Sequence, residues 1–305
     1  MESVLALDES GSTVIVKVGA YDEAMGTVEE RRLAGDRARV ELEVLQQLKH
    51  PNAQPIVASG STPDYRPYFA VRYDEDAKTL RTLLEKGPLA VPEAISVALQ
   101  ILSALEAAHE LGVLHRNIRP ETVIATLGPN GPAVRLDGFG LAKVMVASGP
   151  ISPLGRPTTN AYLSLPVHYR SPEMMMGHDV EVSSDIYQVG MLLFEMLEGR
   201  LPPLGGPGSD LTPEQKTPRL SRGPGSLGRL VDACLSVKPT ERPKTVGAMM
   251  ARLRFVASRL DSAERKQIQR VGGRGHASVV RSDGGVRSAG GAGRRGAGVS
   301  RRAGV

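Results

Sequence analysis

The sequence has little cysteine and no long apolar run. Its single cysteine, Cys234, cannot form an internal disulfide bond, which fits a reducing compartment and excludes a disulfide-stapled extracellular domain. The first residues contain no basic segment followed by an apolar one, so we expect no secretory signal peptide. No apolar stretch approaches the roughly 20 residues that cross a bilayer. The composition therefore predicts a cytoplasmic chain without a membrane span.

A net positive charge is also missing outside the C-terminus. The formal net charge is +5, but residues 271–305 hold seven Arg, one Asp and no Lys or Glu, so residues 1–270 sum to −1. A near-neutral body argues against a globular nucleic-acid reader, because such proteins usually present a basic face. The length of 305 residues suffices for one large domain or for two lobes.

Residues 1–78 have the pattern of a small β-rich lobe. Residues 13–16 form a β-branched run, residues 37–49 carry apolar side chains at helical spacing, and residues 67–73 alternate again. We expect a small sheet with one helix. The stretch between Gly19 and Gly35 looks soft, which predicts that the helix is displaced or partly unwound there.

Residues 79–265 have the pattern of a larger helical lobe. One amphipathic helix is predicted from Pro92 to a C-terminal cap at Gly112. A second, over residues 185–198 before Gly199, is apolar on most faces and should lie at the centre of the lobe. Residues 200–226 are rich in Pro and Gly and predict an irregular connection, followed by helices at 227–235 and 246–260.

Residues 266–305 form a tail rich in Gly, Ala, Ser and Arg. The tail has hardly any large apolar side chain that could offset the entropy of ordering, so we predict that it is disordered. Its Arg-Gly repeats suit nucleic acid or an acidic partner, and they equally suit a solvated linker.

Five motifs occur in a fixed order along the chain. The first is His115-Arg116-Asn117-Ile118-Arg119-Pro120-Glu121-Thr122, and the others are Gly138-Phe139-Gly140-Leu141-Ala142, Ser171-Pro172-Glu173, Ser184-Asp185-Ile186-Tyr187 and Pro239-Thr240-Glu241-Arg242-Pro243. The ordered set resembles the protein kinase superfamily, with the bacterial serine/threonine kinase type closest. The resemblance implies an α+β fold with two lobes, a truncated β-rich N-lobe and a larger helical C-lobe.

The resemblance also shows which catalytic residues are missing. Asn117 stands at the position of the general base, where an amide cannot accept a proton, and Arg119 replaces the usual lysine of that loop. Thr122 and Gly138 stand where the family holds Mg²⁺. The one replacement ligand in reach is Asp137, but successive residues of an extended chain point in opposite directions, so we expect it to face away.

The glycine-rich loop that covers the phosphates in kinases has no counterpart. If Val4–Asp8 is aligned with the strand that follows this loop, only Met1–Ser3 remain in front of it. Either the start site is set too late or the small lobe is truncated.

The residues that the resemblance assigns to the scaffold are present. Lys17 and Glu41 can form the ion pair between strand and helix, and Lys17 either contacts a phosphate or, as we favour, is kept for this pair. Arg116 either captures a phosphate in the loop after Gly140 or faces a solvated loop. The remaining scaffold positions are a buried spine, its anchor and a second ion pair, at His115, Phe139, Asp185, Glu173 and Arg242.

Three functions follow from the resemblance. The first is a catalytically inactive pseudokinase that binds a protein partner, such as an active kinase, as a scaffold or allosteric regulator, with no cofactor expected. The second is an active or weakly active serine/threonine kinase with a mis-set N-terminus, which uses Asp137 for Mg²⁺. The third is a switch that binds ATP without metal. Contact with nucleic acid is expected only through the Arg- and Gly-rich tail.

Overall fold

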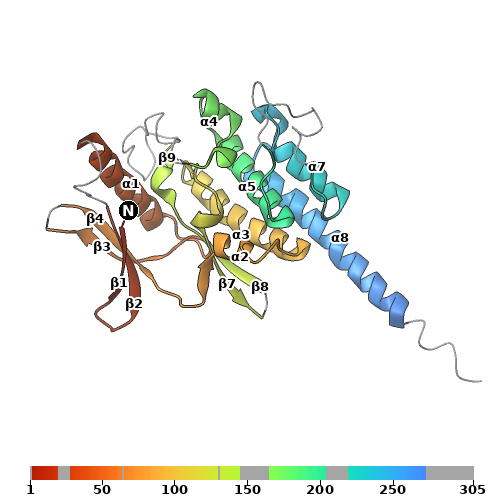
Figure 1. Ribbon diagram of the computed structural model, residues 1–305, viewed down its shortest axis with the longest axis horizontal. Coiled ribbons are helices and arrows are strands. Elements are labelled where there is room, and N and C mark those ends of the chain that lie inside the picture. The colour runs from red at the N-terminus through yellow and green to blue at the C-terminus, as the bar shows by residue number, and fades with distance from the viewer. Residues whose placement is uncertain are drawn as a thin grey trace, which may run out of the picture. The chain divides into compact units, whose positions relative to one another are not determined.

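A computed structural model describes residues 2–19, 28–63, 65–129, 131–144, 165–203 and 219–272 (Figure 1). Met1–Asp261 forms one compact unit and the residues after it form a second. The predicted disorder of the tail from residue 273 onwards and most of the predicted irregular connection, at residues 204–218, lie outside the described residues.

The chain begins with a four-stranded antiparallel sheet in the order β1-β2-β4-β3. Its strands are β1 (Glu2–Leu7), β2 (Thr13–Val18), β3 (Ile56–Ser61) and β4 (Pro67–Arg72). The β-branched run that predicted a strand forms most of β2, since such side chains pack well on a pleated surface. Lys17 lies directly opposite Phe69 of β4, so both side chains project from the same face of the sheet.

Helix α1 (Val28–Gln47) follows the first two strands. It begins nine residues before the predicted Arg37 and includes Gly35, so the predicted unwinding up to Gly35 is wrong for the described residues. Val44 and Leu45 on this helix are buried in the same core as Phe69. This packing outweighs the roughly 1 kcal/mol that a glycine costs inside a helix.

The larger lobe that follows the first sheet is mainly helical in its described residues. Its helices are α2 (Leu80–Leu84), α3 (Val91–Glu110), α4 (Pro172–Met176), α5 (Val182–Glu198), α7 (Gly225–Cys234) and α8 (Val246–Gly272). The prediction for α5 is confirmed, because every residue from Ser184 to Leu197 is buried. Helix α5 ends where Gly199 adopts a φ of 70°, a left-handed conformation that glycine adopts without strain. Helix α8 continues beyond Leu260, where it was predicted to end.

Between Thr122 and Asp137 the chain forms a β-hairpin that the sequence analysis did not identify. Strands β7 (Val123–Gly128) and β8 (Gly131–Leu136) pair in antiparallel fashion, and β5 (Ala77–Thr79) adds a third strand to β7. Strand β6 (Val113–Leu114) pairs separately with β9 (Lys143–Val144). The hairpin places Thr122, just before β7, beside Asp137, just after β8, where the Asp137 amide donates to the Thr122 carbonyl at 2.9 Å.

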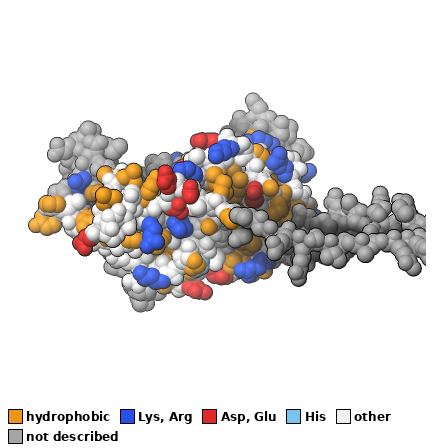
Figure 2. Space-filling view, turned by 90° about the horizontal axis from the view of Figure 1, so that it is seen from below, with side chains coloured by type: hydrophobic (Ala, Val, Ile, Leu, Met, Phe, Trp, Pro, Cys, Tyr) orange, Lys and Arg blue, Asp and Glu red, His pale blue; other side chains and the backbone are white. Residues whose placement is uncertain are grey.

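Helix α3 is long and apolar enough to cross a membrane by length and composition, with a mean hydropathy of 1.3, so the expectation that no stretch approaches this length is wrong. In this structure Ile101, Leu102 and Leu105 of α3 are fully buried in the core that they share with α5. On the face shown in Figure 2, acidic and basic side chains are interspersed among apolar ones.

Candidate functional site

A cleft of about 410 Å³ brings together residues from the sheet, from α1 and from the loops on either side of the β7–β8 hairpin. It contains most of the positions that the sequence singled out for chemistry. The lining residues are Ser3, Lys17, Arg37, Glu41, Asn117, Arg119, Glu121, Thr122, Asp137, Gly138, Gly140 and Leu141.

Lys17 contacts two carboxylates in this cleft. Its Nζ lies 3.4 Å from Oε1 of Glu41, so the structure contains the predicted pair between β2 and α1. The shorter contact is with Asp137, whose Oδ2 lies 2.5 Å from the same nitrogen. The cationic group of Lys17 is therefore bound by two acids rather than by one.

The structure does not turn Asp137 away from the cleft, as the alternation of an extended chain had predicted. Strand β8 ends at Leu136, and Gly138 adopts a φ of 83°, so the chain is no longer extended at this point. Alternation of side chains holds only within a strand. The turn at Gly138 lets Asp137 point toward Lys17, with its side chain only 15% exposed.

The three charged groups shift one another's pKa. Burial raises the pKa of Glu41 to about 7, with Lys17 opposing this shift and the Asp137 carboxylate adding to it. Burial would also raise the pKa of Asp137, but the Lys17 ammonium lowers it overall. Lys17 itself loses hydration, and the two carboxylates nonetheless raise its pKa. The arrangement that follows is a charged Lys17–Asp137 pair beside a Glu41 whose protonated form is favoured by burial.

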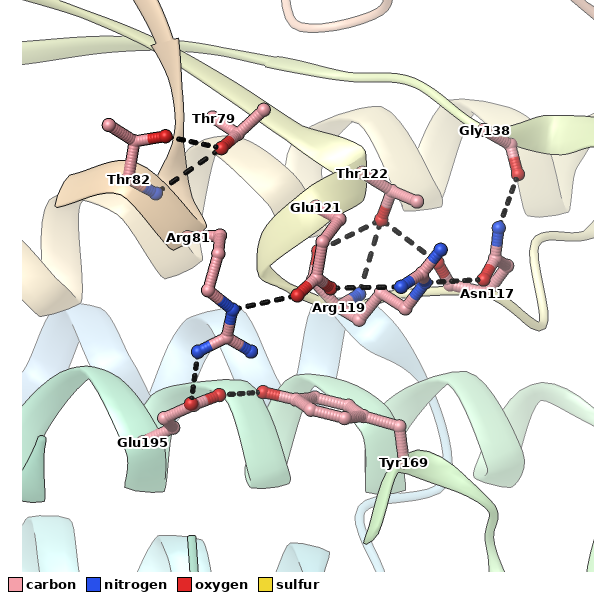
Figure 3. A network of polar contacts seen from close by, with 10 residues as sticks. All are labelled: Thr79, Arg81, Thr82, Asn117, Arg119, Glu121, Thr122, Gly138, Tyr169 and Glu195. Atoms are coloured by element: carbon pink, nitrogen blue, oxygen red, sulfur yellow. Dashed lines mark hydrogen bonds and ion pairs between the residues drawn. The ribbon is translucent and has the colours of Figure 1, made fainter. Parts of the chain in front are cut away.

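Asn117, Thr122 and Gly138 form a set of mutual hydrogen bonds (Figure 3). The Asn117 Nδ2 donates to the Gly138 carbonyl at 3.1 Å, and the Asn117 Oδ1 accepts from Nε of Arg119 at 3.1 Å. The Thr122 hydroxyl lies 2.9 Å from the carbonyl oxygens of Asn117 and Arg119. Both ends of the amide and the hydroxyl proton are thus used within the loop.

A further polar network, centred on Arg81 of α2, supports this loop. Its Nε donates to Glu121 at 2.7 Å and its Nη1 donates to Glu195 of α5 at 2.6 Å (Figure 3). The Tyr169 hydroxyl donates to the other oxygen of Glu195. No local pattern in the sequence indicates this network, because Arg81 is separated from its two partners by 40 and 114 residues.

Asp185 of α5 holds the start of the loop at His115 and Arg116. Its two carboxylate oxygens accept from the backbone amides of His115 and Arg116 at 3.0 and 2.7 Å, and Nε2 of His109 lies 2.8 Å away. The His115 ring packs against Phe139 with 4.3 Å between centroids. The structure thus brings together the predicted spine residues and the predicted anchor.

The surroundings of His115 keep its ring neutral. Burial lowers the pKa of His115 to about 4, although the Asp185 carboxylate acts in the opposite direction. Its Nε2 lies 3.0 Å from the Asp137 carbonyl oxygen. A neutral, fully buried ring with a backbone partner fits the scaffold role predicted for this residue.

Arg116 is buried in a strained backbone conformation. Its φ is 61°, in the left-handed region, and its Nε donates to the Leu141 carbonyl at 2.7 Å. The hydroxyl residues that could present a phosphate to it lie within residues 145–164, outside the described part of the chain. Phosphate capture by Arg116 therefore stays a prediction.

Glu173 and Arg242 form a buried ion pair, as the motifs implied. The Arg242 guanidinium donates through Nη1 and Nη2 to the two Glu173 oxygens at 2.7 and 2.8 Å. Ser184 donates to the same carboxylate at 2.5 Å, and the guanidinium lies 5.0 Å from the centre of the Tyr187 ring. Burial would raise the pKa of Glu173, but Arg242 and Ser184 lower it overall.

Comparison with known families decides what this arrangement is. Residues 4–253 match the protein kinase domain family. The chain belongs to the protein kinase family. A solved structure of the Rad53 kinase domain with SCD2 shares the fold with a TM-score of 0.56 at 21% identity, over 81% of this chain and 80% of that one.

Several serine/threonine kinases of bacteria are similar to this chain in sequence. The chain is 30% identical over 251 residues to the serine/threonine-protein kinase pkn3 of Myxococcus xanthus. This alignment covers 78% of the chain and 45% of pkn3. The chain is also 30% identical over 246 residues to PknL of Mycobacterium tuberculosis (76% of this chain, 59% of PknL). With PrkC of Bacillus subtilis it shares 32% identity over 189 residues, 62% of this chain and 27% of PrkC. The chain spans less than two thirds of each of these relatives.

The kinase cleft of this chain does not fit a pair of Mg²⁺ ions. A kinase holds them with an Asp at the position of Gly138 and an Asn at the position of Thr122. Gly138 offers no side chain, the Thr122 hydroxyl is bonded within the loop, and the described residues contain no cluster of three or more potential metal-binding side chains. Oδ1 of Asp137 is buried without a hydrogen-bond partner, but Lys17 binds the other oxygen of that carboxylate. One carboxylate oxygen beside a lysine is a poor substitute for an octahedral oxygen set.

Proposed function

We propose that this kinase domain is a pseudokinase, which transfers no phosphate and acts by binding. Its role would be that of a scaffold or allosteric regulator in serine/threonine kinase signalling in the cytoplasm, with a protein as its partner. The observation that carries the proposal is the closed hydrogen-bond set of Asn117, Thr122 and Gly138, which stands in place of a base and two metal ligands.

The loss of the base follows from the amide chemistry of Asn117. The lone pair of an amide nitrogen is delocalised and an amide oxygen is only weakly basic, so neither atom can take a proton from a hydroxyl nucleophile. Both atoms are also hydrogen-bonded within the loop, to the Gly138 carbonyl and to Arg119. General-base help is worth about 10²- to 10⁴-fold in rate. Without a metal pair as well, the charge of a transferring phosphoryl group would not be neutralised.

The scaffold contacts support a role in binding. Asp185 still holds the loop, and the ion pair of Glu173 with Arg242 is intact and buried. A folded domain that keeps these contacts and lacks catalytic groups can still present surfaces to a partner. Contact with nucleic acid is proposed only for the Arg- and Gly-rich tail.

A weakly active kinase is the second candidate, and one observation favours it. Asp137 faces the cleft, so its carboxylate could serve a metal if Lys17 gave up the contact to its Oδ2. This function would also require that the hydroxyl nucleophile lose its proton without a general base at position 117.

A phosphoryl-transfer assay on the full chain tests both candidates. The protein would be incubated with radiolabelled ATP, with Mg²⁺ or Mn²⁺, alone and with myelin basic protein, beside the isosteric variant Asp137→Asn. We expect no incorporation above that of the variant. Incorporation that Asp137→Asn abolishes, with the variant shown to be folded by circular dichroism, would refute the pseudokinase proposal and support the second candidate.

A further inference from the structure

A groove of about 430 Å³ lies between α7 and α8, outside the kinase cleft. Figure 1 shows these two helices beside each other. Both helices contribute apolar and basic side chains to it. The lining residues are Ser226, Arg229 and Leu230 of α7, and Ala251, Arg252, Phe255 and Val256 of α8.

The groove has an apolar base and an aromatic wall. Leu230 and Val256 are almost fully buried, at 4% and 3% exposure, and form the base. Phe255 is 54% exposed, although it is among the largest apolar side chains of the lobe. The Arg259 guanidinium lies 4.7 Å from the centre of the Phe255 ring and covers one of its faces. Because Phe255 lines the groove and is partly exposed, it can contact an apolar group placed there.

The charge around the groove is positive and unbalanced. Arg229 and Arg252 are exposed, and no ion pair between described residues involves either of them. Residues 225–234 and 246–260 contain four Arg and a single acid, Asp232, which does not line the groove. Two guanidinium groups beside an apolar base attract carboxylates.

We propose that this groove docks an acidic segment of a partner protein. An apolar side chain of that segment would fill the base beside Phe255, while flanking Asp or Glu carboxylates pair with Arg229 and Arg252. The Arg-rich tail of this chain is unsuited to the groove, because residues 271–305 carry seven Arg and one Asp. Nucleic acid would pair with the arginines but would leave the apolar base unfilled, so a peptide matches more of the surface. The groove is separate from the kinase cleft, so the proposal holds whether or not the domain transfers phosphate.

Peptide selection on the full chain tests the docking site. Short random peptides displayed on phage would be selected on the purified protein, and the enriched peptides would be synthesised and titrated by fluorescence anisotropy. The test variant is R229E/R252E, with Phe255→Ala as a second variant. The control is Arg254→Glu, which reverses one charge on α8, half the change of the double variant, on the side that faces α3. Circular dichroism would confirm that all variants fold.

We expect the enriched peptides to carry an aromatic or aliphatic residue between acidic ones. Their affinity should fall by at least about tenfold on R229E/R252E and on Phe255→Ala, and by less than about twofold on Arg254→Glu. An equal loss of peptide affinity on Arg254→Glu would refute a specific docking groove. Enrichment of peptides without this pattern would refute it too, as would peptide binding that the groove variants leave unchanged. Oligouridylate RNA that displaces the peptide and shows the same dependence on the variants would overturn the proposal in favour of nucleic acid. Each outcome is independent of the phosphoryl-transfer assay.

Discussion

Gly138 and Thr122 are fitted to each other, and this fit can be tested by substitution. A Cβ atom added to Gly138 would lie 2.6 Å from Cγ2 of Thr122 and 3.3 Å from Nδ2 of Asn117. The backbone of Gly138 is also left-handed, with a φ of 83°. Gly138→Ala should therefore destabilise the domain for two separable reasons, strain and overpacking.

The magnitudes of the two effects can be assigned separately. A left-handed conformation costs a residue with a Cβ roughly 1–2 kcal/mol, and overpacking by one methyl group costs a further 1–3 kcal/mol. Thr122→Ser removes the clashing Cγ2 and retains the hydroxyl that contacts the Asn117 and Arg119 carbonyls. In the Thr122→Ser background, Gly138→Ala should lose most of the overpacking cost, because the shortest contact is gone and only the contacts at 3.1 Å with Cβ of residue 122 and at 3.3 Å with Nδ2 of Asn117 remain. The cost of strain should be unchanged.

A double-mutant cycle measured by urea unfolding tests this reasoning. The free energies of unfolding of the two single variants and the double variant are compared with that of the parent. We predict a coupling of about 1–3 kcal/mol, with the double variant more stable than the sum of the single effects implies. Additivity within about 0.5 kcal/mol would show that Gly138 and Thr122 do not restrict each other.

Three further predictions concern charged groups. Glu173→Gln should lower the free energy of unfolding by about 3–5 kcal/mol near pH 7, because it leaves the buried Arg242 without its partner. Since Arg242 and Ser184 lower the pKa of Glu173, this loss should shrink when urea unfolding is repeated below the ordinary Glu pKa of 4.5, and an unchanged loss would contradict the assignment. Because the pKa of Glu41 is raised to about 7, the stability of the domain should fall as the pH rises through that value. Glu41→Gln should therefore flatten the dependence of the thermal unfolding midpoint on pH between about pH 5 and pH 8. A variant whose midpoint changes with pH in parallel with that of the parent would contradict this. Arg81→Ala should cost about 1–3 kcal/mol in urea unfolding by leaving the buried Glu195 unpaired, with Arg81→Lys costing less, and equal costs would refute a role for the charge.

The order of the motifs was enough to predict the α+β fold and most of the scaffold contacts. Glycine at the end of an apolar run located the end of α5, because Gly199 adopts the left-handed conformation that stops a helix. The β7–β8 hairpin went unrecognised, although Asn130-Gly131 between two apolar runs is a strong hairpin signal.

Two features of the site could not have been found by local rules. The direction of the Asp137 side chain depends on where β8 ends and on the φ of Gly138. The alternation rule applies only inside a strand, and β8 ends at Leu136, one residue before Asp137. The Arg81 network depends on tertiary contacts between α2, the loop and α5, which no spacing in the sequence records. In both cases the tertiary structure determines the chemistry of the site.

The proposed function requires that the cleft of this kinase domain holds no magnesium–nucleotide pair in a form that supports transfer. Calorimetric titration of the full chain with a non-hydrolysable ATP analogue, with and without Mg²⁺, tests it most directly. Because Gly138 and Thr122 supply no metal ligand and Lys17 binds Asp137, we predict that Mg²⁺ changes neither the affinity nor the heat of binding. Binding that requires Mg²⁺ would contradict the account.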